Sequence, residues 1–184
     1  MNRWRHLAGF TLMELMVVLA IIGIGMLVAV PSYQGMVERN RLSSQVNEFQ
    51  TAFNYARSEA IRLNTYVVLC QSIDGTVCSS PTSGVWAGWL VRTAGAAPGG
   101  ETGPVLRSVQ YGESNVVMTS DALLASNSHA IRFSPQGLIR SYANSSPLSS
   151  AVKFCVNDDS NTVYQLQFSS GGQSTVELIS EQCN

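Results

Sequence analysis

The chain contains few charged residues. Only 12% of its 184 residues are charged, with 11 Lys and Arg against 12 Asp and Glu, so the formal net charge is −1. Proteins that bind nucleic acid or other polyanions through a general basic surface carry a clear cationic excess. The composition therefore argues against a general polyanion-binding protein.

The chain is also poor in residues that carry catalysis or hold metal ions. Of its two histidines, only His129 lies beyond the first ten residues. Neither a nucleophile elbow nor a phosphate-binding loop or zinc signature occurs, and the adjacent Asp158 and Asp159 are expected to be solvated on a turn. The four cysteines are too far apart for CxxC metal sites. We therefore predict no enzyme activity, no metal and no cofactor.

The longest apolar segment runs from Phe10 to Val30. Its 21 residues include one charge, Glu14, and as a helix it would be close to the roughly 30 Å of a bilayer's hydrocarbon core. Arg3 and Arg5 precede it and no acid does, which predicts an N-terminus in the cytoplasm. Everything after Pro31 should then be exported.

The start of this segment carries a specific motif. Gly9-Phe10-Thr11-Leu12-Met13-Glu14, followed by the apolar run, resembles the class III signal of type IV pilins and pseudopilins. The resemblance implies that a prepilin peptidase removes residues 1–9 by cutting between Gly9 and Phe10, and that Phe10 becomes N-methylated. It also implies an inner-membrane precursor with a periplasmic domain, later incorporated in a pilus at the cell surface.

Glu14 is the residue that an ordinary membrane anchor explains least well. An acid at the centre of a spanning helix costs about 2.5 to 3.5 kcal/mol, and less near the edge. In the family that it resembles, this acid pairs with the free amine of a neighbouring subunit's first residue, here Phe10. The resemblance thus implies assembly with other major and minor pilins through the N-terminal helix. A simple signal anchor, with Glu14 near the headgroups, is the alternative.

The helix is expected to change character along its length. Gly23, Gly25 and Pro31 predict a place where it bends or locally melts, because proline removes a donor and glycine weakens a helix interior. Residues 31–64 then form an amphipathic helix that packs on the domain's own sheet, with a coiled-coil partner as the alternative. Its expected apolar face consists of Leu42, Val46, Phe49, Phe53, Ala56, Ala60 and Leu63.

Residues 65–184 are expected to form a β-rich globular domain, so the predicted fold class is α+β with a mostly antiparallel sheet. Short apolar runs bounded by Gly, Pro, Ser or Asn indicate strands. They are 66–70, 85–86 with 89–91, 105–111, 116–119, 131–133, 151–156, 163–168 and 175–179. Ser134 to Gly137 and Asn157 to Asn161 predict hairpin turns, the latter in preference to a calcium loop, and 93–104 a mobile loop. Trp86 and Trp89 are expected in the core.

All four cysteines lie on the exported side, where disulfides persist. Four cysteines allow three connectivities, and we favour Cys70 with Cys78 and Cys155 with Cys183 because each pair closes a local loop. On the chain-entropy estimate these bridges contribute about 2.5 and about 3.5 kcal/mol.

Three further stretches resemble the minor pilins FimT and FimU and the secretion pseudopilin GspH. They are Ala56 to Arg62 and Arg132 to Gly137, with Val67 to Cys70 between them. The resemblance implies a minor pilin that takes part in pilus assembly or priming near the tip, with a type II secretion pseudopilin as the alternative.

A DNA-uptake receptor is the less favoured function. FimT-like proteins are thought to bind DNA through a Gly-Arg-x-Arg pattern near the C-terminus, where this chain has Gly171 to Ser174 and no later Lys or Arg. With a turn at 134–137, Arg132 should pair with Ile139 and Arg140 with Ile131, which would turn the two arginines to opposite faces. Nucleic acid is therefore not an expected partner.

Overall fold

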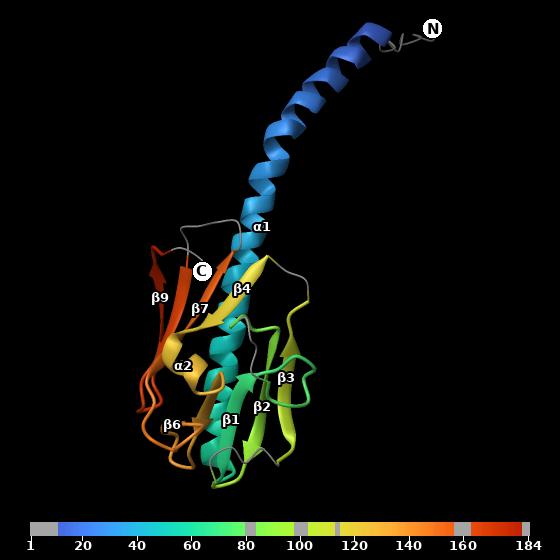
Figure 1. The fold of residues 1–184 in the computed structure, drawn as a ribbon. Helices are drawn as coiled ribbons and strands as arrows, with labels where there is room; N and C mark the ends of the chain where they lie inside the picture. Colours follow the sequence, from blue (N-terminus) through green and yellow to red (C-terminus); the bar gives the residue numbers. More distant parts are fainter. Residues whose placement is uncertain (1–10, 80–83, 98–102, 113–114, 157–162, 182–184) are drawn as a thin grey trace, which may run out of the picture. The chain divides into compact units, whose positions relative to one another are not determined.

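The computed structural model describes residues 11–79, 84–97, 103–112, 115–156 and 163–181, apart from the side chains of 27–32 and 34 (Figure 1). The chain divides into two compact units, Met1–Glu38 and Arg39–Asn184. Both contain part of one α-helix, α1 (Leu12–Arg62), which is continuous through Gly23, Gly25 and Pro31. The kink expected at these three residues stays a prediction.

Helix α1 ends in a left-handed cap. Asn64 has φ 49°, and the N–H groups of Asn64 and Thr65 donate to the carbonyls of Ile61 (3.3 Å) and Ala60 (3.2 Å). This pair of bonds is the Schellman arrangement, in which asparagine can replace glycine because its short polar side chain tolerates positive φ. The cap turns the chain directly into β1 (Tyr66–Gln71).

The remaining elements form two antiparallel sheets. The first has the order β3-β2-β1-β5-β6, and the second the order β4-β7-β8-β9. Their bounds are β2 Gly88–Ala94, β3 Val105–Gln110, β4 Val116–Ser120, β5 Ala130–Phe133, β6 Ile139–Ser141, β7 Ser150–Val156, β8 Val163–Phe168 and β9 Ser174–Ile179, with a short helix α2 at Ala122–Ser126.

The main core lies between the second half of α1 and the two sheets. Phe53 contacts Phe133 of the first sheet at 5.0 Å between ring centroids and Phe168 of the second at 5.7 Å. The buried apolar residues of α1 are Leu42, Val46, Phe49, Ala52, Phe53, Ala56 and Ala60. The predicted apolar face is therefore confirmed except at Leu63, which is exposed because it lies beyond the last helical residue.

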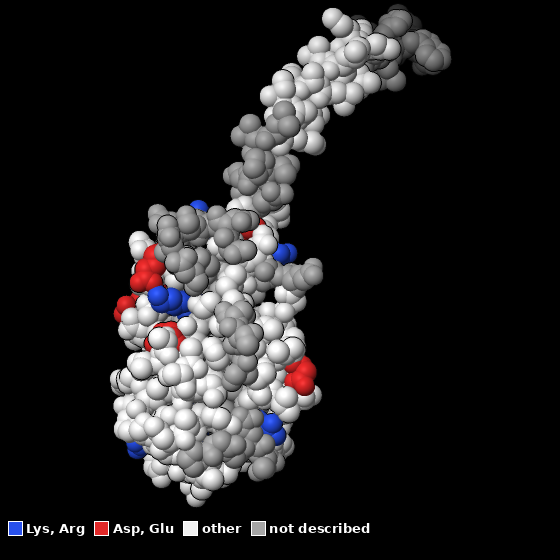
Figure 2. Space-filling model, viewed as in Figure 1, with Lys and Arg blue, Asp and Glu red and all other residues white. Residues whose placement is uncertain are grey.

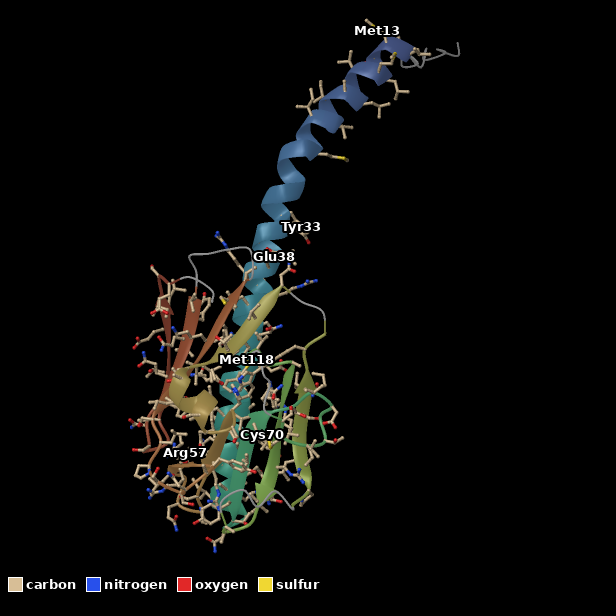
Figure 3. All side chains as sticks on the ribbon, viewed as in Figure 1. Met13, Tyr33, Glu38, Arg57, Cys70 and Met118 are labelled. Atoms are coloured by element: carbon tan, nitrogen blue, oxygen red, sulfur yellow. A yellow bond between two sulfur atoms is a disulfide. The ribbon has the colours of Figure 1, made fainter. Side chains whose placement is uncertain are left out.

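Two hairpin turns of the same design meet at Arg57 of α1. In the turn after β5, Ser134 N–H donates to Leu138 O and Gly137 N–H to Ser134 O. The turn after β8 repeats this with Ser169, Gln173 and Gly172. Arg57 Nε donates to Gly137 O at 3.0 Å, and a Cβ at Gly172 would lie 2.6 Å from that Nε (Figure 3).

The predicted register of the β5–β6 hairpin is wrong. Arg132 pairs with Arg140, and Phe133 pairs with Ile139, so the two arginines lie opposite each other on one face of the sheet. The loop contains five residues, 134–138, where the prediction allowed four. Gly137 occupies a left-handed conformation (φ 73°) that accommodates the extra residue, and a shift of one residue moves each side chain to the other face.

Most of the expected strands are present. Both tryptophans lie in the core, as predicted. Trp86 and Trp89 are buried, and their indole N–H groups donate to Ser120 Oγ and to the Tyr111 hydroxyl, each at 2.8 Å. The 85–86 run lies outside β2, and its Val85 forms an isolated bridge with Thr119 of β4. The turn predicted at 157–161 lies outside the described residues.

Within the described part of the chain, no helix is both long enough and apolar enough to qualify as a membrane-crossing segment.

Candidate functional site

The first turn of α1 is organised by Thr11 and Glu14. Glu14 N–H donates to Thr11 Oγ1 at 3.2 Å, and Leu15 N–H donates to Thr11 O at 3.2 Å. Threonine followed three residues later by glutamate is the capping-box sequence, and an acid in the first turn also favours the helix dipole. Glu14 therefore has a local role in starting the helix in addition to the intersubunit role predicted for it. Gly9 and Phe10 lie outside the described residues.

The α1 segment that follows exposes apolar side chains on all sides (Figure 3). The exposed large residues are Leu12, Met13, Leu15, Met16, Val17, Val18, Leu19, Ile21, Ile22, Ile24 and Met26. Water-exposed apolar surface of this extent marks an interaction site with a membrane or with other proteins. We call residues 12–26 the apolar segment.

Two glycines in this segment are not required by packing within the chain. A Cβ placed on Gly23 or Gly25 would meet no atom within 4 Å. Glycine in a helix interior costs up to about 1 kcal/mol relative to alanine, so its presence needs another reason. Close approach of a neighbouring helix, or a local change of conformation, would each supply one.

The predicted Cys70–Cys78 disulfide is present, with 5.6 Å between the Cα atoms (Figure 3 labels Cys70). Inside its loop the Asp74 carboxylate accepts from Thr76 N–H (2.8 Å), Thr76 Oγ1 (2.7 Å) and Val77 N–H (3.1 Å), and these bonds lower the pKa of Asp74. Cys155 is also disulfide-bonded. Its predicted partner, Cys183, lies outside the described residues.

His129 lies beside the Ser120 hydroxyl, and this contact connects two segments of the domain. Its Nδ1 lies 2.9 Å from Ser120 Oγ, which also accepts the Trp86 indole N–H, and burial lowers the pKa of His129. The contact joins the segment after α2 to β4. Among the described residues, no group of three or more His, Cys, Asp or Glu side chains could hold a metal ion. Asp158 and Asp159 lie outside them.

Arg132 is buried, with an exposed fraction of 1%. Its guanidinium donates to Ser145 Oγ (2.7 Å) and to the carbonyls of Gly95 (2.6 Å) and Ala96 (2.7 Å), and stands 3.9 Å from the Tyr66 ring centroid. It thus fastens the loop after β2 to the sheet and is not available to a phosphate. The corrected register therefore does not create a basic surface from Arg132 and Arg140.

The described surface also shows no broad charged field on the face seen in Figure 2, where blue and red atoms form a few separate groups. Gly171 to Gln173 lie in the 169–173 connection between β8 and β9, and Ser174 is the first residue of β9. This connection presents no basic side chain of its own.

Comparisons with known proteins agree with the geometry. Residues 45–172 match the family model described as type II transport protein GspH, and residues 4–30 match the prokaryotic N-terminal methylation motif. A stretch of 39 residues, 21% of this chain, is 54% identical to the fimbrial protein EcpC of Eikenella corrodens and spans about a quarter (26%) of that relative.

Two solved structures share the fold. A crystal structure of the type IV minor pilin FimU of Pseudomonas aeruginosa matches with a TM-score of 0.55 at 20% identity, over 76% of this chain and 90% of that one. A second crystal form of FimU gives a TM-score of 0.52 at 18% identity, over 73% of this chain and 91% of that one.

Proposed function

We propose that this chain, which belongs to the family described as type II transport protein GspH, is a minor pilin of a type IV pilus. In this proposal it is a structural rather than catalytic subunit, and it helps to prime pilus assembly near the tip. The fimbrial relative and the FimU fold support a pilus.

The observation that carries the proposal is the apolar segment. Its side chains are exposed, whereas the buried positions of α1 begin only at Leu42. Such a surface needs a lipid environment first and protein neighbours afterwards. We therefore propose that residues 10–30 cross the inner membrane with the N-terminus in the cytoplasm and the domain in the periplasm. Prepilin peptidase then cuts after Gly9, Phe10 is methylated, and the apolar segment enters the filament core.

Glu14 supplies the register of assembly in this proposal. Its carboxylate would pair with the ammonium group of Phe10 on an adjacent subunit. In a low-dielectric filament core an unpaired ammonium is costly, so a subunit that lacks this acid leaves its neighbour's charge without a partner.

A type II secretion pseudopilin is the second candidate, favoured by the description of the matching family. It would use the same helix and the same processing in a different machine. Deletion of the gene separates the two, because loss of pili would support the pilus role and loss of protein secretion with normal pili would support the alternative. A DNA receptor has no comparable support, since Arg132 is enclosed and the β8–β9 turn has no basic side chain.

The capping geometry allows the pairing role of Glu14 to be tested apart from its local role. Glu14→Ala and Glu14→Gln both remove the charge, while Gln at this position retains the capping-box pattern. Thr11→Ala removes the cap, at about 1 kcal/mol, and retains the carboxylate. We expect both Glu14 variants to be inserted and cut normally, yet to crosslink severalfold less to neighbouring pilins in membranes at matched expression.

Thr11→Ala is the matched control and should crosslink nearly as well as the wild type. Equal losses in Thr11→Ala and Glu14→Ala, with Glu14→Gln like the wild type, would assign the effect to helix capping. Unchanged crosslinking and piliation in both Glu14 variants would contradict the pairing.

A further inference from the structure

A hollow of about 330 Å³ lies beside the 169–173 turn, at the edge of the second sheet where β8 ends and where β7 and β9 begin. The residues that line it are Ser149, Gln167, Phe168, Ser169, Gln173 and Thr175. Gln167 and Thr175 are cross-strand partners on β8 and β9.

The walls of the hollow are held in place by bonds and packing outside it. Phe168 is buried against Phe53, and Ser170 N–H donates to Ser149 Oγ at 2.9 Å. The turn is closed by two backbone hydrogen bonds of 2.9 Å each, and its Gly172 lies against Gly137 O and Arg57. The backbone and the buried side of the hollow are therefore preformed, whereas the exposed Gln167 and Gln173 side chains would be ordered by a ligand.

The lining carries no charge, and its polar groups lie among more extensive apolar surface. It offers two primary amides and three hydroxyl groups, and each of these groups has both a donor and an acceptor. The side chains of Gln167 and Gln173 are exposed, and neither amide makes a hydrogen bond within the described residues. Phosphates and nucleic acids require cationic partners, which this lining lacks.

A ligand that matches this chemistry is uncharged and carries several neighbouring hydroxyl groups. Adjacent sugar hydroxyls each donate and accept, which suits an amide that presents both functions on one plane. The methylene stems of the glutamines and the Thr175 methyl provide apolar surface for the C–H groups of a sugar ring. The volume is at the lower end of the roughly 300 to 1,000 Å³ of ligand pockets, which suits one or two sugar rings.

We propose that this hollow binds a neutral glycan. The ligand class follows from an uncharged lining that presents amides and hydroxyls on a fixed backbone. The proposal goes beyond the filament role and does not depend on whether the chain serves a pilus or a secretion machine.

The test uses the detergent-solubilised full chain on an array of neutral oligosaccharides, of the glucose, mannose, galactose and N-acetylglucosamine series, and of acidic ones printed at the same density. We expect binding to one neutral series. The double variant Gln167→Ala, Gln173→Ala should lower the affinity for that series at least tenfold. Gln165→Ala, the same change two residues away on β8 and outside the lining, should stay within twofold of the wild type.

Thermal unfolding shows whether the double variant is folded. If it is not, Thr175→Trp, which fills the hollow from an exposed position, takes its place and should abolish binding. The proposal is wrong if no neutral series binds, if acidic oligosaccharides bind in preference, or if binding survives both the double variant and Thr175→Trp.

Discussion

The ionisable residues that could have formed a binding or catalytic site in this domain instead make hydrogen bonds that connect its segments. Arg132 holds the loop after β2 by hydrogen bonds to its carbonyls, and Asp74 holds the disulfide loop. His129 joins the end of the α2 segment to β4 through Ser120. Sequence reasoning predicted correctly that Trp86 and Trp89 are core residues. It could not assign partners to the polar residues, because their contacts are far apart in sequence and depend on which face of a strand each one occupies.

His129 gives the domain a pH-dependent stability. Burial lowers its pKa below the ordinary value of about 6.5, so the unfolded state binds the proton more readily than the folded state. The histidine's contribution is therefore fully present above about pH 6.5 and is lost as the pH falls through the folded-state pKa. We expect the urea concentration at which half of the full chain is unfolded, the urea midpoint, to decrease when the pH is lowered from 7.5 to 5.

The matched variant for this measurement is His129→Asn. Asparagine tolerates the φ of 50° at this position and still offers a group to Ser120, but it does not titrate. Its urea midpoint should change less over the same pH interval. If the urea midpoint changes equally with pH in the wild type and in His129→Asn, the pH dependence comes from other groups.

At the scale of elements, the two glycine-closed turns determine register. Both are five-residue loops that begin with Ser and have Gly in the fourth position, Ser134 to Leu138 and Ser169 to Gln173. The glycine pattern was visible in the sequence, but the extra residue beyond the turn was not counted, so Arg132 and Arg140 were assigned to opposite faces. Helix α2 was missed as well, although Asp121 caps it by accepting from Leu124 N–H at 2.8 Å. Five residues are too few for a clear helical period.

Adjacent glycines in the β8–β9 turn provide a sharp test of this packing. Gly172 has φ 84°, and a Cβ there would lie 2.3 Å from Gly137 O, whereas a Cβ at Gly171 would have no neighbour closer than 3.7 Å. Gly172→Ala should therefore lower the free energy of unfolding by roughly 2 to 4 kcal/mol, from left-handed strain together with overpacking. Gly171→Ala should change it by less than about 1 kcal/mol. Chemical denaturation of the two variants checks the difference, and equal losses would contradict the described turn.

At the scale of the whole molecule, the sequence predicted the class of fold and the signal at its start. The motif from Gly9 to Glu14 and the apolar run are local features, so they could be recognised without any knowledge of tertiary contacts. The division of the strands into two sheets was not predicted, because nothing local distinguishes a strand of one sheet from a strand of the other. The hollow beside the 169–173 turn was not predicted for the same reason. Its glutamines resemble any solvent-exposed strand residue until the turn is placed.

The central claim is that the chain is processed after Gly9 and becomes a filament subunit through its N-terminal helix. Mass spectrometry of the chain recovered from sheared, purified pili tests this most directly. The account predicts a mature protein in the filament fraction whose first residue is N-methylated Phe10. Absence of the chain from the filaments, or an N-terminus at Met1 or beyond Ala29, would contradict it.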